Sequence, residues 1–257
     1  MLFIGAFEMA QSHVEHHWEY SYYPLILAAG IFFAVPLAFA SMFQYENGLM
    51  AAIFAGIGVP LIVIGIAGWT AEGISDKQGQ GYAVSGIPIF IVSEAMIFLC
   101  LFISYWMLRL SAPEWPPEGS PEIGVGLPII MTFVLVASSF TYHFGEIKME
   151  AEDGSGFIKW LIISMVLGTV FLLMTGYEYN HLLSQGFGWG TNAKSTAFYS
   201  ITGFHASHVL VGLCIFLTVL IPAFAGNINQ TFVKSAGIYW HFVDIVWFFV
   251  VSQIYLW

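Results

Sequence analysis

The sequence predicts an all-α integral membrane protein with seven transmembrane helices, arranged as a two-helix hairpin and a five-helix bundle. Three observations support this prediction: 58% of the 257 residues are hydrophobic, only 9% are charged, and seven apolar runs are long enough to cross a bilayer. Typical soluble domains carry about 25% charged residues. A hydrocarbon core needs roughly 20 helical residues to cross it. The predicted spans are 23–42, 49–71, 86–110, 125–147, 157–179, 197–224 and 235–257.

The first two spans differ from the later five. Only a short segment around Tyr45-Glu46-Asn47-Gly48 separates them, which predicts a tight antiparallel hairpin over 23–71. The hairpin has almost no charge within its apolar runs, and its second span is rich in glycine, which lets membrane helices approach closely. The later spans carry nearly all the embedded polar groups and predict a bundle over 86–257. Residues 1–22 are predicted to form an interfacial segment.

The charge, the cysteine positions and the N-terminal residues argue against nucleic-acid binding, a disulfide framework and a cleavable signal peptide. The formal net charge of −10 reflects few Lys and Arg residues, so no basic patch exists to neutralise nucleic-acid phosphates. Cys100 and Cys214 lie in apolar runs, which indicates packing residues rather than a disulfide framework. The segment Met1–Ala10 lacks the basic start of a cleavable signal peptide and contains Glu8.

The distribution of basic residues predicts the orientation of the chain. Four lysines lie on the side of the predicted bundle shared with the N-terminus, and two basic residues lie on the other side: Lys77, Lys148, Lys159 and Lys234 against Arg109 and Lys194. Loops on the cytoplasmic side carry an excess of Lys and Arg. We therefore expect a cytoplasmic N-terminus and a C-terminus on the outer side.

Glu94 and Asp244 are ionisable residues inside predicted spans. Glu94 lies about eight residues into its span, or roughly 12 Å deep, and Asp244 lies at a similar depth in the last span with His241 one turn away. An ionisable group in hydrocarbon costs roughly 2.5–3.5 kcal/mol, so such groups usually face protein and have a function. We expect these three residues to share one polar network that organises protons. A neutral Glu94 bonded between helices, or an ion pair that only fixes packing, explains the same pattern.

His205 and His208 lie three residues apart on one face of the sixth span. Together with His241 and Asp244 they are of the residue types that ligate transition metals, so a metal site is one interpretation. Di-metal sites in helical bundles, however, use several glutamates together with Glu-x-x-His motifs. We therefore expect no metal on this chain and favour a buried polar network, whose predicted members are His143, Glu178, His205, His208, His241 and Asp244.

Two segments outside the spans also carry informative residues. His13-Val-Glu-His-His17 precedes the membrane and is interpreted as an interfacial strap that ends at Trp18, with surface metal binding as the alternative. Trp115-Pro-Pro-Glu-Gly119 is a proline-restricted loop at the outer surface. It is predicted to present a fixed shape to a neighbouring subunit, or simply to stiffen the loop.

Five motifs, in order from about Trp69 to the C-terminus, resemble those of subunit III of the cytochrome c oxidases in the haem–copper oxidase superfamily. They are Phe90-Ile-Val-Ser-Glu94, Trp115-Pro-Pro-Glu-Gly119, Gly176-Tyr-Glu-Tyr179, Thr202-Gly-Phe-His-Ala-Ser-His-Val209 with Gly212, and Tyr239-Trp-His-Phe-Val-Asp-Ile-Val-Trp247. Seven spans also resemble the cytochrome c oxidases more than the quinol oxidases, whose third subunit commonly has five.

The resemblance implies a subunit of an oxidoreductase complex that holds no haem, no copper and no catalytic centre of its own. It implies packing on the catalytic subunit I, in a complex with subunit II, as a V of two and five helices with phospholipid in the cleft. Haem and copper are then expected on the partner subunits. It also implies support for proton delivery, with Glu94 as the family's embedded acid, and protection of the oxygen-reducing site. The expected location is a bacterial inner membrane.

Three segments depart from the family pattern. The loop Glu72–Ser85 is shorter than usual and lacks the basic residues that many relatives place just before the third span, and Ile221-Pro-Ala223 stands where relatives often carry a cation. Both departures affect contacts with lipid phosphate, for which the candidates are Trp69, Glu72, Lys77 and Lys234. Tyr142-His143-Phe144 replaces a frequent histidine pair, which predicts a changed surface near His143.

Two other functions fit the same residues. A third subunit of a quinol oxidase or a nitric oxide reductase would share this architecture, because the chain does not encode the electron donor. A self-sufficient membrane metalloenzyme would use the histidines of the last two spans and would retain metal on the isolated chain.

Overall fold

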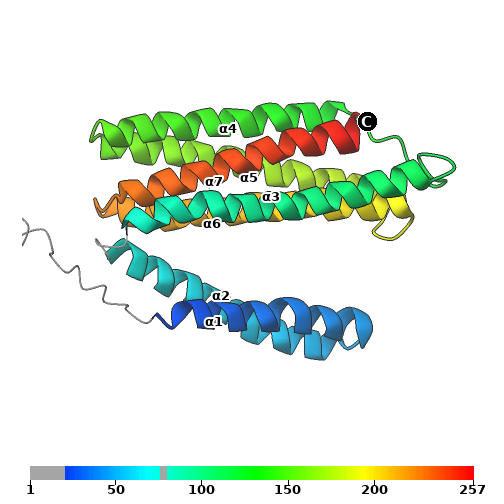
Figure 1. The fold of residues 1–257 in the computed structure, drawn as a ribbon, viewed down its shortest axis with the longest axis horizontal. Helices are drawn as coiled ribbons and strands as arrows, with labels where there is room; N and C mark the ends of the chain where they lie inside the picture. Colours follow the sequence, from blue (N-terminus) through cyan, green and yellow to red (C-terminus); the bar gives the residue numbers. More distant parts are fainter. Residues whose placement is uncertain (1–20, 76–79) are drawn as a thin grey trace, which may run out of the picture. The chain divides into compact units, whose positions relative to one another are not determined.

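The structure is a computed structural model that describes residues 21–75 and 80–257 (Figure 1). Within these residues, seven helices are long and apolar enough to cross a membrane, which confirms the predicted all-α membrane fold. The predicted interfacial segment, with its histidine cluster, lies outside the described residues except for Ser21 and Tyr22. The chain divides into two compact units, Met1–Gly73 and Ile74–Trp257.

The described part of the first unit is a helical hairpin. Its first arm is α1 (Tyr23–Phe32) followed by the π-helical stretches η1 (Phe33–Leu37) and η2 (Ala40–Gln44), and its second arm is α2 (Gly48–Ser75). Gly58 brings the two arms together, because a Cβ at this position would lie 2.4 Å from the backbone nitrogen of Ala34. Only glycine allows so close an approach of two membrane helices.

The second unit is a five-helix bundle made of α3 (Gln80–Ser111), α4 (Gly126–Glu150), α5 (Gly154–Ser184), α6 (Ala193–Phe224) and α7 (Gln230–Val250), with the π-helical stretch η3 (Val251–Tyr255) at its end. α7 packs against α3, α4 and α6, and a larger share of its span is buried than in any other described span. Figure 1 shows α7 running between α4 and α3. Polar groups on α7 are therefore placed in contact with three neighbouring helices.

Several helices begin before the apolar runs that predicted them, because polar residues cap their first turns. α5, α6 and α7 begin at Gly154, Ala193 and Gln230, ahead of the predicted starts at 157, 197 and 235. The side chains of Asp153, Asn192 and Asn229 accept hydrogen bonds from the backbone N–H groups of these turns. Such caps satisfy donors that the helix itself leaves free.

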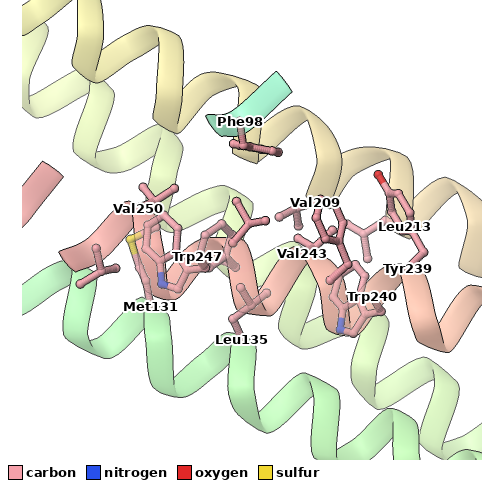
Figure 2. Packing of buried hydrophobic residues seen from close by; sticks show 14 of the residues in the cluster. Phe98, Met131, Leu135, Val209, Leu213, Tyr239, Trp240, Val243, Trp247 and Val250 are labelled. Carbon is pink, nitrogen blue, oxygen red and sulfur yellow. The ribbon is translucent and has the colours of Figure 1, made fainter. Parts of the chain in front are cut away.

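Large aromatic side chains fill the centre of the bundle (Figure 2). Trp240 is fully buried, and its ring lies against Gly168 of α5 and Gly212 of α6. Its indole N–H donates to the hydroxyl of Ser138 on α4 at 2.8 Å. One side chain of α7 thus fixes the spacing to three other helices, which places the polar groups of those helices relative to one another.

Candidate functional site

Glu94 on α3 is paired with His208 on α6. Oε2 of Glu94 lies 3.2 Å from Nε2 of His208, and the two side chains are 17% and 10% exposed. The other ring nitrogen, Nδ1, lies 2.8 Å from the carbonyl oxygen of Phe204. A carbonyl oxygen only accepts hydrogen bonds, so Nδ1 must carry a hydrogen. The bond between Nε2 and Oε2 therefore uses one proton that either Glu94 or His208 can hold.

Aromatic rings surround this pair. The rings of Phe98 and Phe204 lie 5.1 Å and 4.5 Å from the imidazole of His208, measured between ring centroids. The hydroxyl of Tyr239 on α7 donates to the backbone carbonyl of His208 at 3.2 Å. These contacts hold the imidazole in place on α6, and they leave its Nε2 directed at Glu94.

Asp244 belongs to a different group of contacts, between α7 and α4. Its Oδ2 accepts a hydrogen bond from the hydroxyl of Ser139 and lies 4.0 Å from Nδ1 of His241. The Ser139 hydroxyl also lies 3.2 Å from this Nδ1. Ser139 therefore bridges the carboxyl group and the imidazole. Within the described residues, Oδ1 of Asp244 is buried without a hydrogen-bond partner.

His205 forms a third, separate contact. Its ring is fully buried, and its Nε2 donates to the carbonyl oxygen of Val243 on α7 at 3.1 Å. The rings of Phe171 and Trp247 lie 5.6 Å and 4.9 Å from the imidazole. Its Nδ1 is buried and, among the described residues, has no partner. This arrangement joins α5, α6 and α7 through one imidazole.

Glu178 and His143 lie apart from these three groups. Glu178 is buried near the end of α5 and accepts a hydrogen bond from the hydroxyl of Tyr255 in η3 at 2.7 Å. His143 is exposed rather than buried, and its Nδ1 lies 3.5 Å from Oε2 of Glu146. The side chains predicted to form one network thus make several local contacts, and His143 faces outward because it lies on the exposed side of α4.

Three of the four candidates for lipid contact lie in the described part of the chain, near the ends of α2 and α7. Nζ of Lys234 lies 2.9 Å from Oε1 of Glu150, and both side chains are exposed. Trp69 and Glu72 are exposed on α2. Lys77 lies outside the described residues. Trp69 and Glu72 belong to the first unit and Lys234 to the second.

The histidines of α6 and α7 do not converge on one centre. His208 faces Glu94, His205 faces the carbonyl group of Val243, and His241 faces Ser139. In the ranges that the structure describes, no three His, Cys, Asp or Glu side chains gather as a metal site requires. The geometry therefore does not support the metalloenzyme alternative.

Sequence reasoning missed Ser139 and Tyr255, which partner two of the acids. Ser139 follows Ser138 inside the apolar run of α4, and two adjacent hydroxyls in such a run are a signal for hydrogen bonds between helices. Tyr255 lies near the C-terminus among aromatic residues, and nothing in its spacing distinguishes it from an interfacial anchor.

Comparison with known proteins gives a consistent family assignment. The family model for cytochrome c oxidase subunit III matches residues 13–257. Cytochrome c oxidase subunit 3 of Synechocystis sp. is 39% identical over 175 residues, covering 66% of this chain and 74% of that protein. The same subunit of Thermostichus vulcanus is 37% identical over 200 residues, covering 72% and 98%. A probable cytochrome c oxidase subunit 3 of Nocardia farcinica is 38% identical over 174 residues, covering 66% and 85%.

Proposed function

The chain belongs to the cytochrome c oxidase subunit III family, and we propose that it serves as the non-redox, membrane-embedded third subunit of a bacterial oxidase. The family match over residues 13–257 carries this proposal. In this role the chain packs on subunit I, in a complex with subunit II, and those partners hold the haem and copper. The complex lies in the inner membrane with the N-terminus of this chain on the cytoplasmic side, in accord with the distribution of lysines.

The proposal assigns the proton-linked role to Glu94 with His208. The two groups share one proton over the 3.2 Å between Oε2 and Nε2, so the proton can move between them without a change of rotamer. The Glu94 side chain is 17% exposed, so the pair is accessible from outside the bundle. A proton held there is available to an adjoining subunit or to water at the subunit boundary, which is how this chain would support proton uptake.

Phospholipid binding is a further part of the proposal. The ion pair between Lys234 and Glu150 is exposed, and exposed pairs contribute only about 0–1 kcal/mol. The Lys234 ammonium group can therefore turn from Glu150 to a lipid phosphate at little cost. Trp69 adds an exposed indole of the kind that anchors membrane proteins at the level of the headgroups.

The proton role is tested with the oxidase complex carrying Glu94→Gln. Glutamine keeps the size of the side chain and still hydrogen bonds to His208, but it cannot release a proton at neutral pH. We expect normal assembly together with a severalfold loss of proton uptake rate or of turnover lifetime. Unchanged activity, proton uptake and inactivation rate would leave only a packing role for Glu94.

Glu178→Gln is the matched control for this variant. Glu178 is another acid of the bundle that hydrogen bonds to a side chain of another element, but its partner is the hydroxyl of Tyr255 rather than an imidazole. We expect this variant to behave as wild type in proton uptake.

The subunit assignment is tested separately by mild purification, followed by stripping this chain from its partners and assaying metal and haem on each fraction. We expect the redox centres with the partner chains, whose haem type and electron donor then identify the oxidase. Metal at unit stoichiometry on the stripped chain would overturn the assignment.

A further inference from the structure

Polar side chains line the contact between α4 and α7 from one end of the bundle to the middle of the membrane. On α4 they follow steps of three or four residues and on α7 steps of seven and three, which places them on one face of each helix. We call this set the α4–α7 polar stripe: Ser139, His143, Glu146 and Glu150 on α4, and Lys234, His241 and Asp244 on α7. No part of the function proposed above uses this stripe as a unit.

The aqueous end of the stripe contains charged and exposed groups. Lys234 pairs with Glu150, and the carboxylate of Glu146 lies so close to Gly237 that a Cβ there would be 2.6 Å from Oε1. The side chain of His143 is 59% exposed, and its Nδ1 lies 3.5 Å from Oε2 of Glu146. Exposed titratable groups thus extend to the point where the stripe enters the apolar part of the bundle.

The inner end of the stripe is the sequence of contacts from His241 through Ser139 to Asp244. The side chain of His241 is 44% exposed, whereas that of Asp244 is 9% exposed. Asp244 lies 14 residues after Gln230, the first residue of α7, which is roughly 21 Å along the helix. The Ser139 hydroxyl lies between the two, 3.2 Å from Nδ1 of His241 and hydrogen bonded to Oδ2 of Asp244.

The hydrogen-bonding groups of His241, Ser139 and Asp244 are placed in an order that suits proton transfer, which helix packing alone does not require. A hydroxyl group can accept one hydrogen bond while it donates another, so Ser139 can join an imidazole donor to a carboxylate acceptor. Oδ1 of Asp244 has no protein partner among the described residues, so the carboxyl group can gain or lose a proton without breaking a second bond.

Titratable groups of the other packed helices are engaged elsewhere. On α6, His205 donates to the carbonyl oxygen of Val243, and on α3, Glu94 is paired with His208. His241 is therefore the group of the described bundle that lies within ion-pair reach of the Asp244 carboxyl group.

We propose that His241, Ser139 and Asp244 form a proton relay that connects the aqueous end of the α4–α7 polar stripe to a proton-binding carboxyl group in the middle of the membrane. A proton from water binds Nε2 of His241 and forms an N–H bond. The hydrogen on Nδ1 then passes to the oxygen of Ser139, while the hydroxyl hydrogen of Ser139 passes to Oδ2 of Asp244. His241 ends neutral, Ser139 is regenerated and Asp244 holds the proton. The reverse sequence returns it to water.

Infrared spectroscopy of the full chain in its oxidase complex tests this relay. A protonated Asp244 gives a carbonyl stretching band that Asp244→Asn lacks, and transfer to heavy water shifts this band at the rate of proton exchange. Ser139→Ala removes the bridging hydroxyl, so we expect exchange to slow by about tenfold or more. Ser139→Thr restores a hydroxyl and should return the rate close to that of wild type.

Ser104→Ala is the control, because its hydroxyl donates only to the carbonyl oxygen of Cys100 in its own helix. It should leave exchange unchanged.

An unchanged rate in Ser139→Ala, or the absence of an Asp244 band at every pH at which the complex is intact, would overturn the relay. If Ser139→Ala fails to assemble, His241→Asn decides, since it removes the imidazole and must also slow exchange. The band is independent of Glu94→Gln, so failure of the relay and failure of the proton role of Glu94 are distinguishable.

Discussion

Trp240 lies at the centre of the bundle with glycines of two neighbouring helices against its ring. A Cβ at Gly212 would lie 2.6 Å from two ring carbons of Trp240, and one at Gly168 would lie 2.8 Å from a third. The indole cannot move away easily, because it is fully buried, donates to Ser138 and packs on Phe216 at a centroid distance of 4.7 Å. Both glycines are therefore required by the size of one side chain.

Gly212→Ala should destabilise the bundle. Adding a methyl group to a closely packed core costs about 1–3 kcal/mol, because the rigid ring and the helix must separate. Thermal unfolding in detergent measures the effect as a lower midpoint. Gly176→Ala on α5 is the matched control, since nothing lies within 4 Å of a Cβ there. Equal midpoints for the two variants would contradict the role assigned to Trp240.

At the scale of secondary-structure elements, polar caps set where the helices of the bundle begin. Asn192 illustrates this: its Oδ1 accepts from the backbone N–H of Ser195, and the Ser195 hydroxyl accepts from the backbone N–H of Asn192. The Asn192 side chain also donates to the backbone carbonyl of Glu118 and the hydroxyl of Ser120. One residue thus begins α6 and attaches the proline-rich loop between α3 and α4 to it.

Asp153 makes the start of α5 sensitive to pH. The backbone N–H of Gly156 and the hydroxyl of Ser155 donate to its carboxylate, and they hold the pKa of Asp153 below its ordinary value. A group with a lowered folded-state pKa contributes stability above its unfolded pKa, about 3.9 for Asp, and loses it as the pH falls through the folded-state value.

Comparison with Asp153→Asn tests this contribution, because asparagine still caps the helix but cannot ionise. We expect wild type to unfold at a higher temperature than the variant near neutral pH, and the difference to shrink below about pH 4 and to disappear once the pH is below the folded-state pKa of Asp153. A difference that stays constant, or that grows as the pH falls, would show that the Asp153 charge does not stabilise the turn.

At the scale of the whole molecule, the sequence predicts the spans and the polar faces but not which faces meet. Hydrocarbon thickness determines the length of the spans, and helical periodicity determines which residues share a polar face. The similar depths of Glu94 and Asp244 predict that they share a network. In the structure α7 presents Asp244 to α4, whereas Glu94 reaches α6. This choice depends on helix rotation, which packing around Trp240 sets and which no single helix encodes.

The separation of polar contacts predicts how substitutions combine. The recorded partner of Glu94 is His208, while Asp244 contacts Ser139 and His241, so the two acids share none of these partners. Effects of Glu94→Gln and Asp244→Asn on the free energy of unfolding should then add to within about 0.5 kcal/mol. Glu94→Gln combined with His208→Asn should deviate from additivity by about 0.5–3 kcal/mol, because these residues contact each other.

Double-mutant cycles on the purified complex measure both combinations under one set of conditions. Glu94→Gln is common to both doubles, and Glu178→Gln adds an acid whose partner, Tyr255, lies in neither group. Strong coupling between Glu94 and Asp244 would mean that the two groups of contacts respond as one network. Additivity there, with coupling between Glu94 and His208, would mean that the bundle keeps its two embedded acids in energetically independent groups of contacts, one between α3 and α6 and one between α4 and α7.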